Sequence, residues 1–249
     1  MKDNKNVLIT GASSGLGKAV LAKLNKLGNC NFALVARNKE KLMRSIAEDI
    51  FSYNDICSLY IKDLKDELQI SELIQAINEP LDTIVLAAGE LKYMPIAFLK
   101  KTELTDVLNI NFISPVLLVQ GLLKAKKIKR GASIVFVSSI SSHVGVIGTL
   151  AYASSKAALE AAVRVLAAEL ASKKIKVNAV CPGLINTPML KEASILNGVD
   201  IISQNSLNYP LGIGEPQDVA AFIAFLVSEE NNWITGQSLI IDGGYILNK

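Results

Sequence analysis

Short apolar runs recur along the whole chain, and most of them do not alternate polar with apolar residues. Several are rich in β-branched residues, which are common in strands. Continuous apolar runs of this length suit strands that are covered on both faces, as in a parallel sheet. The runs occupy residues 7–10, 32–36, 57–61, 83–88, 133–138, 175–181 and 238–242.

Segments with helical spacing separate these runs, most clearly at residues 17–28, 152–173 and 215–230. The first of them places an apolar stripe on one side and lysines on the other, and the stripe consists of Val20, Leu21, Leu24 and Leu27. Strands that alternate with helices predict βα units with right-handed crossovers. We therefore expect an α/β fold of the Rossmann type. It would be a doubly wound, seven-stranded parallel sheet with helices on both faces, built by residues 1–249 as a single domain.

Composition excludes several classes of protein. Half of the 249 residues are hydrophobic and the formal net charge is only +3, which is too little to indicate nucleic acid or an anionic membrane as a partner. Cys30, Cys57 and Cys181 are scattered without metal-ligand spacing, so we expect reduced thiols, no metal and a cytoplasmic location. The polar start of the chain predicts no signal peptide, and the apolar runs are too short for a membrane span.

A glycine-rich segment, "TGASSGLGKA", follows the first predicted strand and opens a predicted helix. Gly11, Gly15 and Gly17 would let the chain turn tightly, so that backbone N–H groups approach a pyrophosphate at the helix N-terminus. The alternative is an ordinary turn between a strand and a helix. The position after a first strand favours a dinucleotide site.

The end of the second predicted strand indicates which dinucleotide binds. NAD sites usually place an acidic residue there for the ribose 2′-hydroxyl, whereas this chain has Arg37 followed by Asn38. An arginine can pair with a 2′-phosphate, which an acid would repel. We therefore expect NADP(H) as the cofactor, the alternative being that Arg37 is a solvated surface charge.

Three more strand ends carry candidate residues, because ligands bind at the carboxyl ends of parallel strands. Asp63, followed by Leu64, could accept a hydrogen bond from adenine or cap a helix. Small residues at 86–89 would leave room for a cofactor or would simply pack tightly. After the sixth strand, Thr187 offers a hydroxyl, and residues 188–208 suit either a substrate lid or a surface loop with a short helix.

Tyr152 and Lys156 lie four residues apart in a predicted helix and therefore share one face of it. A lysine ammonium near a phenol favours the phenolate, so we expect a lowered pKa for Tyr152 and a role as acid or base near neutral pH. Ser139, at the end of the fifth strand, could hold the substrate oxygen. Taken alone, a tyrosine and a lysine at this spacing are most often a chance pair.

The ordered set of these motifs resembles the short-chain dehydrogenase/reductase family over nearly the whole chain. The resemblance is carried by "TGASSGLG", "LAAG", Ser139, "YASSK", "VNAVCPGLINTPM" and "ITGQSLIIDGG". The stretch "PLGIGEPQDV" looks like the branch that contains 3-oxoacyl-[acyl-carrier-protein] reductases. The family usually has two asparagines where this chain has Leu86 and Ala87, a departure that puts local rigidity in doubt.

The resemblance implies roles for individual residues. Ser139, Tyr152 and Lys156 match the family's catalytic residues, and Asn111 matches an asparagine that helps to hold a water in a proton relay. Without the resemblance, Asn111 reads as a helix-interior residue with local hydrogen bonds. The implied cofactor-binding residues are Gly11, Ser13, Ser14, Gly15, Leu16, Gly17, Arg37, Asn38, Asp63, Leu64, Ala87, Ala88, Gly89, Tyr152, Lys156, Pro182, Gly183, Ile185 and Thr187.

The activity implied by the resemblance is the NADPH-dependent reduction of a ketone or aldehyde to an alcohol. One candidate substrate is a 3-oxoacyl thioester on a carrier protein, with Arg130 and Lys173 as basic docking residues. The alternative is a small free ketone, a sugar derivative or another alcohol. A third reading is a nucleotide-binding regulator without catalysis. The family also implies a homodimer or homotetramer.

Overall fold

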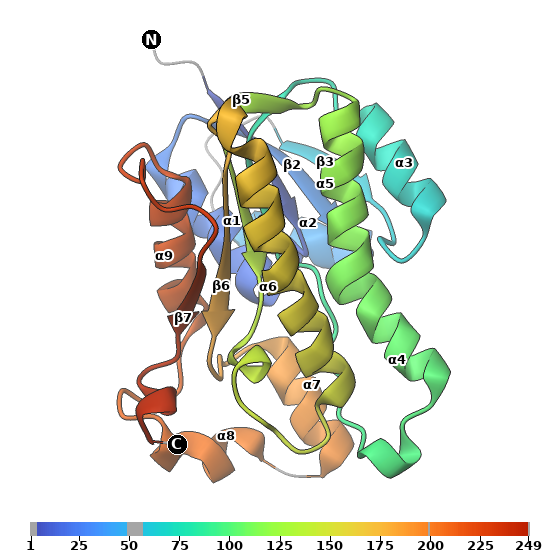
Figure 1. Cartoon of the computed structure of the whole chain (residues 1–249), viewed down its shortest axis with the longest axis vertical. Helices are drawn as coiled ribbons and strands as arrows, with labels where there is room; N and C mark the ends of the chain where they lie inside the picture. The colour runs from blue at the N-terminus through green and yellow to red at the C-terminus, as the bar shows by residue number, and fades with distance from the viewer. Residues whose placement is uncertain (1–3, 49–56, 199, 249) are drawn as a thin grey trace.

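The computed structural model describes residues 4–48, 57–198 and 200–248. Its strands form one seven-stranded sheet in the order β3-β2-β1-β4-β5-β6-β7, and every neighbouring pair is parallel (Figure 1). Each apolar run predicted to be a strand lies on one of them, so the predicted sheet is confirmed. The strands are β1 (Lys5–Thr10), β2 (Cys30–Ala36), β3 (Cys57–Ile61), β4 (Leu81–Leu86), β5 (Ile128–Val137), β6 (Lys176–Pro182) and β7 (Ser238–Ile241).

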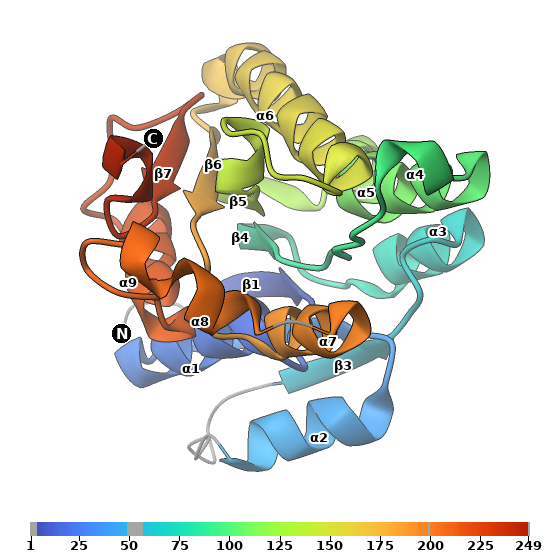
Figure 2. The ribbon, with the colours of Figure 1, turned by 90° about the horizontal axis from the view of Figure 1, so that it is seen from below.

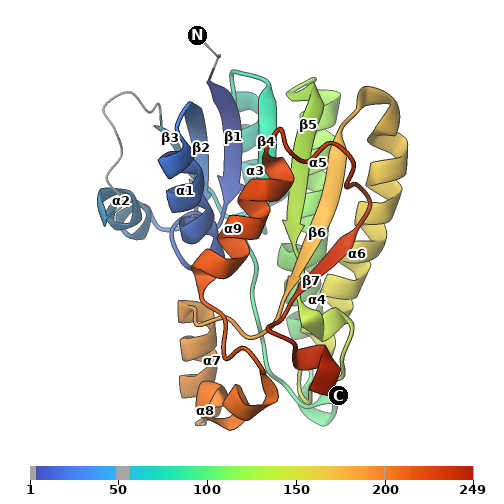
Figure 3. The same cartoon turned by 90° about the vertical axis from the view of Figure 1, so that its left-hand side faces the viewer.

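Helices cover both faces of the sheet, as predicted. In Figures 2 and 3, α1, α2 and α9 lie on one side of the strands, and α3, α5 and α6 lie on the other. The helices are α1 (Gly15–Leu27), α2 (Lys39–Glu48), α3 (Glu67–Ala76), α4 (Lys101–Leu108), α5 (Ser114–Lys124), α6 (Leu150–Leu170), α7 (Pro188–Asn197), α8 (Ile201–Asn205) and α9 (Pro216–Val227).

Two hydrophobic cores explain why the strands do not alternate in polarity. Successive residues of a strand point to opposite faces. Leu8 packs into the core beneath α3, α5 and α6, and Ile9 packs into the core beneath α1 and α9. Leu34 and Val35 divide between the two cores in the same way. Both faces therefore require apolar side chains.

The predicted stripe of the first helix is correct at Val20, Leu21 and Leu24, which are buried. It is wrong at Leu27, whose side chain is 61% exposed. Leu27 is the last residue of α1, directly before Gly28, which has φ 75°. A left-handed residue after the last turn ends the helix, so Leu27 lies where the chain leaves the core.

One long helical run was not anticipated from the sequence. Residues Lys101–Lys124 comprise α4, a single π-helical turn (η2, Asn109–Ile113) and α5. By length and composition alone this run could cross a membrane. In the fold its apolar residues pack against α3, α6 and the sheet, and the core helix of a globular domain passes the same test.

The parallel arrangement brings the carboxyl ends of all seven strands to one edge of the sheet. The segments containing α7 and α8 lie at that edge (Figure 1). The loop between β1 and α1 also lies there, and it packs tightly against the start of its own helix. A Cβ built on Gly17 would stand 2.3 Å from the carbonyl oxygen of Gly11. Only a glycine therefore allows this close approach.

This close approach makes a testable prediction. We expect Gly17→Ala to lower the free energy of unfolding by about 1–3 kcal/mol, because the added methyl group forces the loop and helix apart. Gly145→Ala is the matched control, since a Cβ at Gly145 meets nothing within 4 Å. Chemical denaturation of both variants measures the difference, and equal stabilities would contradict the packing role of Gly17.

Candidate active site

A cavity of about 520 Å³ opens at the carboxyl edge of the sheet. It is lined by residues that follow β1, β2, β3, β4, β5 and β6, together with parts of α6, α7 and α8. Of the residues predicted for catalysis or cofactor binding, all line this cavity except Gly17, Asp63 and Asn111. The fold therefore brings to one place residues that are scattered from position 11 to position 187.

Two of the three exceptions have local roles. Gly17 provides the close contact between α1 and its loop. The carboxylate of Asp63 accepts a hydrogen bond from the backbone N–H of Lys65 at 3.0 Å, within its own turn. The N-cap of α3 is Asp66 and not Asp63, so the capping interpretation of Asp63 is wrong, and its contact with adenine stays a prediction.

The glycine-rich loop forms one end of the cavity. Gly11 and Gly15 have φ angles of 70° and 54°, which favour glycine. A Cβ on Gly11 would stand 2.9 Å from the backbone nitrogen of Ala88. Ser14, at the N-cap of α1, makes no side-chain cap bond to the helix. The positive end of α1 therefore opens toward the cavity, which suits a phosphate group.

The end of β4 is held from two sides, although the asparagines that the family usually has there are missing. The hydroxyl of Thr10 accepts hydrogen bonds from the backbone N–H groups of Ala87 and Ala88, both at 3.1 Å. A Cβ on Gly89 would stand 2.8 Å from the side-chain oxygen of Asn111. The structure thus supplies the rigidity that the sequence put in doubt, and Thr10 has a role that sequence analysis missed.

Arg37 is exposed and forms an ion pair at the edge of the cavity. Its Nη1 lies 2.9 Å from one oxygen of Glu90, and the Nζ of Lys65 lies 2.8 Å from the other. The three side chains join the loops after β2, β3 and β4 above the cavity edge. A guanidinium has five N–H donors, so Arg37 can bind a second anion while it contacts Glu90. Asn38 accepts from the backbone N–H of Lys41 at 2.7 Å and so supports the start of α2.

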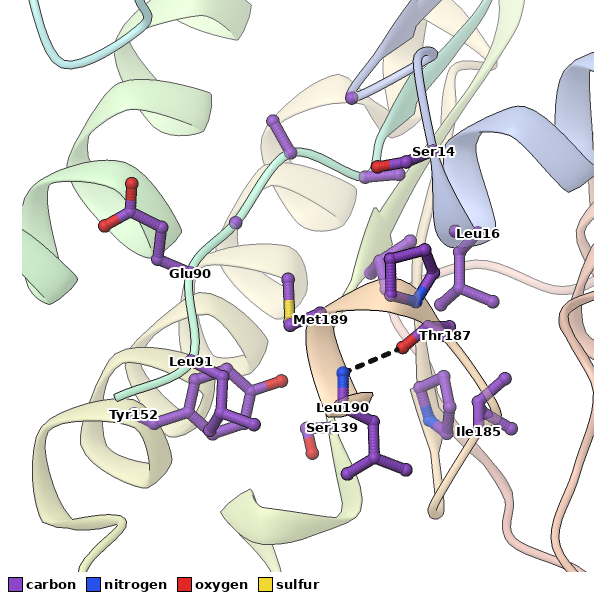
Figure 4. Close-up of a pocket in the computed structure, with 18 of the residues that line it drawn as sticks. Ser14, Leu16, Glu90, Leu91, Ser139, Tyr152, Ile185, Thr187, Met189 and Leu190 are labelled. Carbon is purple, nitrogen blue, oxygen red and sulfur yellow. Dashed lines mark hydrogen bonds between the residues drawn. The ribbon is translucent and has the colours of Figure 1, made fainter. Parts of the chain in front are cut away.

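Ser139, Tyr152 and Lys156 meet at the other end of the cavity. In Figure 4, Tyr152 and Ser139 lie near one another, apart from Ser14 and Leu16 of the glycine-rich loop. The Nζ of Lys156 is 5.6 Å from the centre of the Tyr152 ring and donates to the carbonyl of Val137 at 2.8 Å. Lys156 is buried and Tyr152 is half-buried. The spacing of four residues therefore does place both groups on one face of α6.

The expectation of a lowered pKa for Tyr152 is wrong for this structure. Burial raises the pKa of Tyr152 to about 12, against a smaller opposite effect of a hydrogen bond with Ser139. Burial also lowers the pKa of Lys156 to about 8, while the nearby Cys181 and Glu160 act in the opposite direction. Removal from water disfavours the charged form of both groups, and in both it is the largest cause of the shift.

Asn111 occupies the π-helical turn and is buried. Its side-chain oxygen accepts from the backbone N–H of Glu90 at 2.8 Å, and its side-chain nitrogen donates to the carbonyl of Glu90 at 2.9 Å. The same nitrogen lies 3.0 Å from the hydroxyl of Ser155 on α6. Asn111 therefore connects the loop after β4 to the helix that carries Tyr152 and Lys156.

The segment after β6 closes the cavity. A Cβ on Gly183 would stand 2.9 Å from the Cα of Asp242, so the chain needs glycine here. The sequence suggested an available hydroxyl at Thr187. In the structure, this hydroxyl accepts a hydrogen bond from the backbone N–H of Leu190 at 3.4 Å and caps α7 (Figure 4). Its hydroxyl hydrogen remains able to donate to a ligand.

The predicted lid corresponds to α7 and α8, which pack through Leu190, Ala193 and Ile201 against the partly buried Leu91 and Tyr93. Movement of this segment stays a prediction. Sequence analysis did not name most of the individual side chains at this end of the cavity, although four of them fall within the predicted lid, residues 188–208. The side chains that it did not name are Leu91, Tyr93, Val144, Val146, Met189, Leu190, Ile201, Asn205, Tyr209 and Tyr245.

The site combines three chemical capacities. A helix N-terminus and Arg37 can bind phosphates at one end, and apolar and aromatic side chains can bind an organic molecule at the other. At that second end, Ser139 and Tyr152 present two hydroxyl groups beside a buried amine. Such an arrangement can donate hydrogen bonds and one proton to an oxygen atom of a bound molecule.

The buried amine predicts a pH-dependent stability. The folded-state pKa of Lys156, about 8, lies below its ordinary value of 10.5. The buried ammonium therefore costs stability below pH 8, and this cost disappears as the pH rises from about 8 to 10.5. We expect Lys156→Met to raise the free energy of unfolding at pH 7 by about 1–3 kcal/mol.

The advantage of the Lys156→Met variant should shrink as denaturation is repeated at increasing pH. Lys23→Met, at an exposed position of α1, is the control and should show no such trend. A Lys156→Met variant whose stability relative to the natural chain is the same at pH 7 and pH 10 would contradict the lowered pKa.

Comparison with known proteins gives matches along almost the whole chain. A family model described as enoyl-(acyl carrier protein) reductase matches residues 11–246. The 3-oxoacyl-[acyl-carrier-protein] reductase FabG of Thermotoga maritima is 32% identical, and the match covers 98% of this chain and 99% of that protein. A tropinone reductase homologue of Arabidopsis thaliana is 30% identical, with coverage of 98% and 93%.

Solved structures agree with these sequence matches. The structure of ElxO with NADP bound is 34% identical to this chain and has a TM-score of 0.86. The match covers 98% of this chain and 99% of the ElxO chain. The likeness thus extends over the sheet, the cavity and the segments around it. The chain belongs to the short-chain dehydrogenase/reductase family, whose members are oxidoreductases that use NAD(P) to reduce carbonyl groups.

Proposed function

We propose that the protein is an NADPH-dependent reductase of a ketone or aldehyde, with Tyr152 as the general acid. The observation that carries this proposal is the shape of one cavity. Ser139, Tyr152 and Lys156 lie at one end of it, and the glycine-rich loop and Arg37 lie at the other. A dinucleotide that binds its phosphates on the loop would extend from one group of residues to the other.

The residues that surround the cavity fit NADPH. The close approach of Gly11 to Ala88 leaves no room for side chains between the loop and the end of β4, and both residues border the cavity. Arg37 supplies a cation where a 2′-phosphate would lie, and NADP is bound in the related ElxO structure. When bound, NADPH supplies the hydride for the reduction.

The protein's own residues would supply binding and the proton. Ser139 would donate a hydrogen bond to the carbonyl oxygen, and Tyr152 would transfer its phenolic proton to the same atom. Lys156, which the carbonyl of Val137 holds in place, would put positive charge beside the forming alkoxide. The predicted role of Asn111 in a proton relay stays a prediction, and its contacts to Glu90 and Ser155 support a rigid site.

The raised pKa of Tyr152 supports its proposed role as the acid. With a pKa of about 12 the phenol keeps its proton at neutral pH. Reduction of a carbonyl needs a protonated group as the acid, whereas oxidation of an alcohol needs an ionised one as the base. The site is therefore suited to donate a proton.

Two substrate classes remain as proposals. A 3-oxoacyl thioester is supported by the relatives that act on acyl carrier protein. The position of Arg130 does not add to that support, because Arg130 lies near the start of β5 whereas Ser139 follows its end. The apolar and aromatic end of the cavity suits a free ketone equally well. Comparing kcat/KM for a 3-oxoacyl thioester and for a panel of free ketones distinguishes the two classes.

Other expectations complete the proposal. A cytoplasmic location is supported only by the scattered positions of the three cysteines in the sequence. A homodimer or homotetramer is supported by the family resemblance. The reading as a regulator without catalysis is disfavoured by the presence of Ser139, Tyr152 and Lys156 together. Binding of NADPH without turnover of any carbonyl compound would favour it.

Removal of the phenolic hydroxyl tests the proposed acid. We expect Tyr152→Phe to retain NADPH binding and to lose turnover by about 10²- to 10⁴-fold, because no other group donates the proton. Tyr60→Phe is the control, since Tyr60 bonds to the carbonyl of Ala76 outside the cavity. Stopped-flow or steady-state oxidation of NADPH measures both, and turnover of Tyr152→Phe near the natural rate would refute the role.

A charge reversal tests the proposed cofactor preference. We expect the natural chain to bind NADPH more tightly than NADH and Arg37→Asp to weaken NADPH binding by about 10- to 100-fold, because a charge-assisted contact to the 2′-phosphate is lost. Arg164→Asp, at an exposed position of α6, reverses the same charge away from the cavity. Equal affinities of the natural chain for the two cofactors would overturn the preference.

A further inference from the structure

Glu160 is a buried acidic residue that the proposed reaction does not use. It lies on α6, and its side chain is only 6% exposed. One carboxylate oxygen accepts from the hydroxyls of Ser138, at 2.6 Å, and Ser142, and lies 3.4 Å from the sulfur of Cys181. The other oxygen lies 3.1 Å from Nε2 of His143, the chain's single histidine.

Three of these four groups come from the loop that contains the proposed catalytic serine, and Cys181 comes from β6. Ser138 precedes Ser139 in the chain, and Ser142 ends the short 3₁₀ turn that follows it (η3, Ile140–Ser142). The hydroxyl of Ser142 also lies 2.5 Å from the carbonyl oxygen of Ser139. Glu160 therefore contacts the loop on both sides of Ser139, and it does so from the helix that carries Tyr152 and Lys156.

The position of Glu160 on α6 repeats the spacing of the proposed catalytic pair. Tyr152, Lys156 and Glu160 are four residues apart, so they follow one another along one face of the helix. The hydroxyl of Ser138 lies 3.4 Å from the carbonyl oxygen of Lys156, which brings the strand end close to the same helix turn. The loop that contains Ser139 and helix α6 are thus joined at the backbone of Lys156.

Glu160 also contributes charge near Lys156. Burial of a carboxylate is costly unless hydrogen bonds satisfy it. Burial opposes the charge of Glu160, but the hydrogen bonds from Ser138 and Ser142, with His143 nearby, hold its pKa below the ordinary value. The groups that face Lys156 are Tyr152 and Glu160 from α6 and Cys181 from β6. Glu160 is the carboxylate among them.

A metal site is a second way to read part of this cluster. The ligand atoms of His143, Glu160 and Cys181 lie within 4.8 Å of one another. Two serine hydroxyls already bond to the carboxylate, however, and Cys181 has a pKa that burial raises, so its thiol holds its proton. The observations therefore favour a hydrogen-bonded cluster.

We propose that Glu160 is a positioning residue: its carboxylate fixes the Ser139 loop against α6 and places a negative charge one helical turn from Lys156. The proposal rests on the proposed function only in the roles given to Ser139 and Lys156. It identifies a residue, two helical turns after Tyr152, on which the geometry and the charge of the site both depend.

Kinetics of Glu160→Gln test the proposal. The amide keeps an acceptor for the serines but loses the charge, so we expect kcat to fall about 10- to 100-fold while KM for NADPH changes little. The alkaline limb of the pH–rate profile should move to lower pH, because Lys156 loses its proton more readily. Glu160→Asp, which restores the charge, should return that limb toward its natural position.

The matched control is Glu169→Gln, which removes the same charge from an exposed position on the same helix. We expect this control to keep the natural kcat and pH–rate profile. The proposal would be overturned if Glu160→Gln and Glu169→Gln had the same kcat and the same pH–rate profile. If Glu160→Gln does not fold, Ser142→Ala removes one of the two hydroxyls and should lower kcat in the same direction; an unchanged kcat there would also overturn it.

A measurement without turnover separates this proposal from the proposed function. In the cofactor-free protein, ¹³C-lysine NMR follows the titration of Lys156, whose signal is assigned by its loss in Lys156→Met. We expect the midpoint to move to lower pH in Glu160→Gln and to stay unchanged in Glu169→Gln. A natural chain without carbonyl reductase activity would defeat the proposed function, while an unmoved midpoint in Glu160→Gln would defeat the role of Glu160.

Discussion

The contact between the ends of β1 and β4 is the interaction on which the site depends. Thr10 accepts two backbone hydrogen bonds from the end of β4, and Gly11, the next residue, lies so close to Ala88 that no side chain would fit between them. These two contacts hold the ends of β1 and β4 together at the cavity. The joined strand ends in turn position the glycine-rich loop on one side, and Glu90, Asn111 and α6 on the other.

Burial decides the electrostatics of the site more than any single ion pair does. It raises the pKa of Tyr152 and lowers that of Lys156, so both groups are driven toward their uncharged forms. The acid keeps its proton in this way, which serves reduction. The lysine would lose its charge for the same reason, and the nearby Glu160 opposes that loss. The folded state is thus less stable because it buries an amine whose charge is useful in the site.

Much of the fold was predictable because its signals are local. Continuous apolar runs indicate strands between two cores, and the glycines after the first strand indicate a tight turn into α1. The candidate site was predictable where a motif follows a strand, as at Ser139. Sequence analysis missed Glu160, Thr10 and the contact of Arg37 with Glu90, since these join residues that are far apart in the chain. It also predicted the wrong direction for the pKa shift of Tyr152, because a spacing of four residues does not show how far the two side chains are removed from water.

The pairing of Arg37 with Glu90 also has a consequence for the entropy of ligand binding. A free arginine side chain samples many rotamers, and ordering it on binding costs about 0.5–1.5 kcal/mol. Here the guanidinium is already restrained by a carboxylate whose backbone Asn111 holds on both sides. Part of that ordering takes place when the chain folds. An anion that reaches the rim of the cavity therefore meets a cation that is already in position.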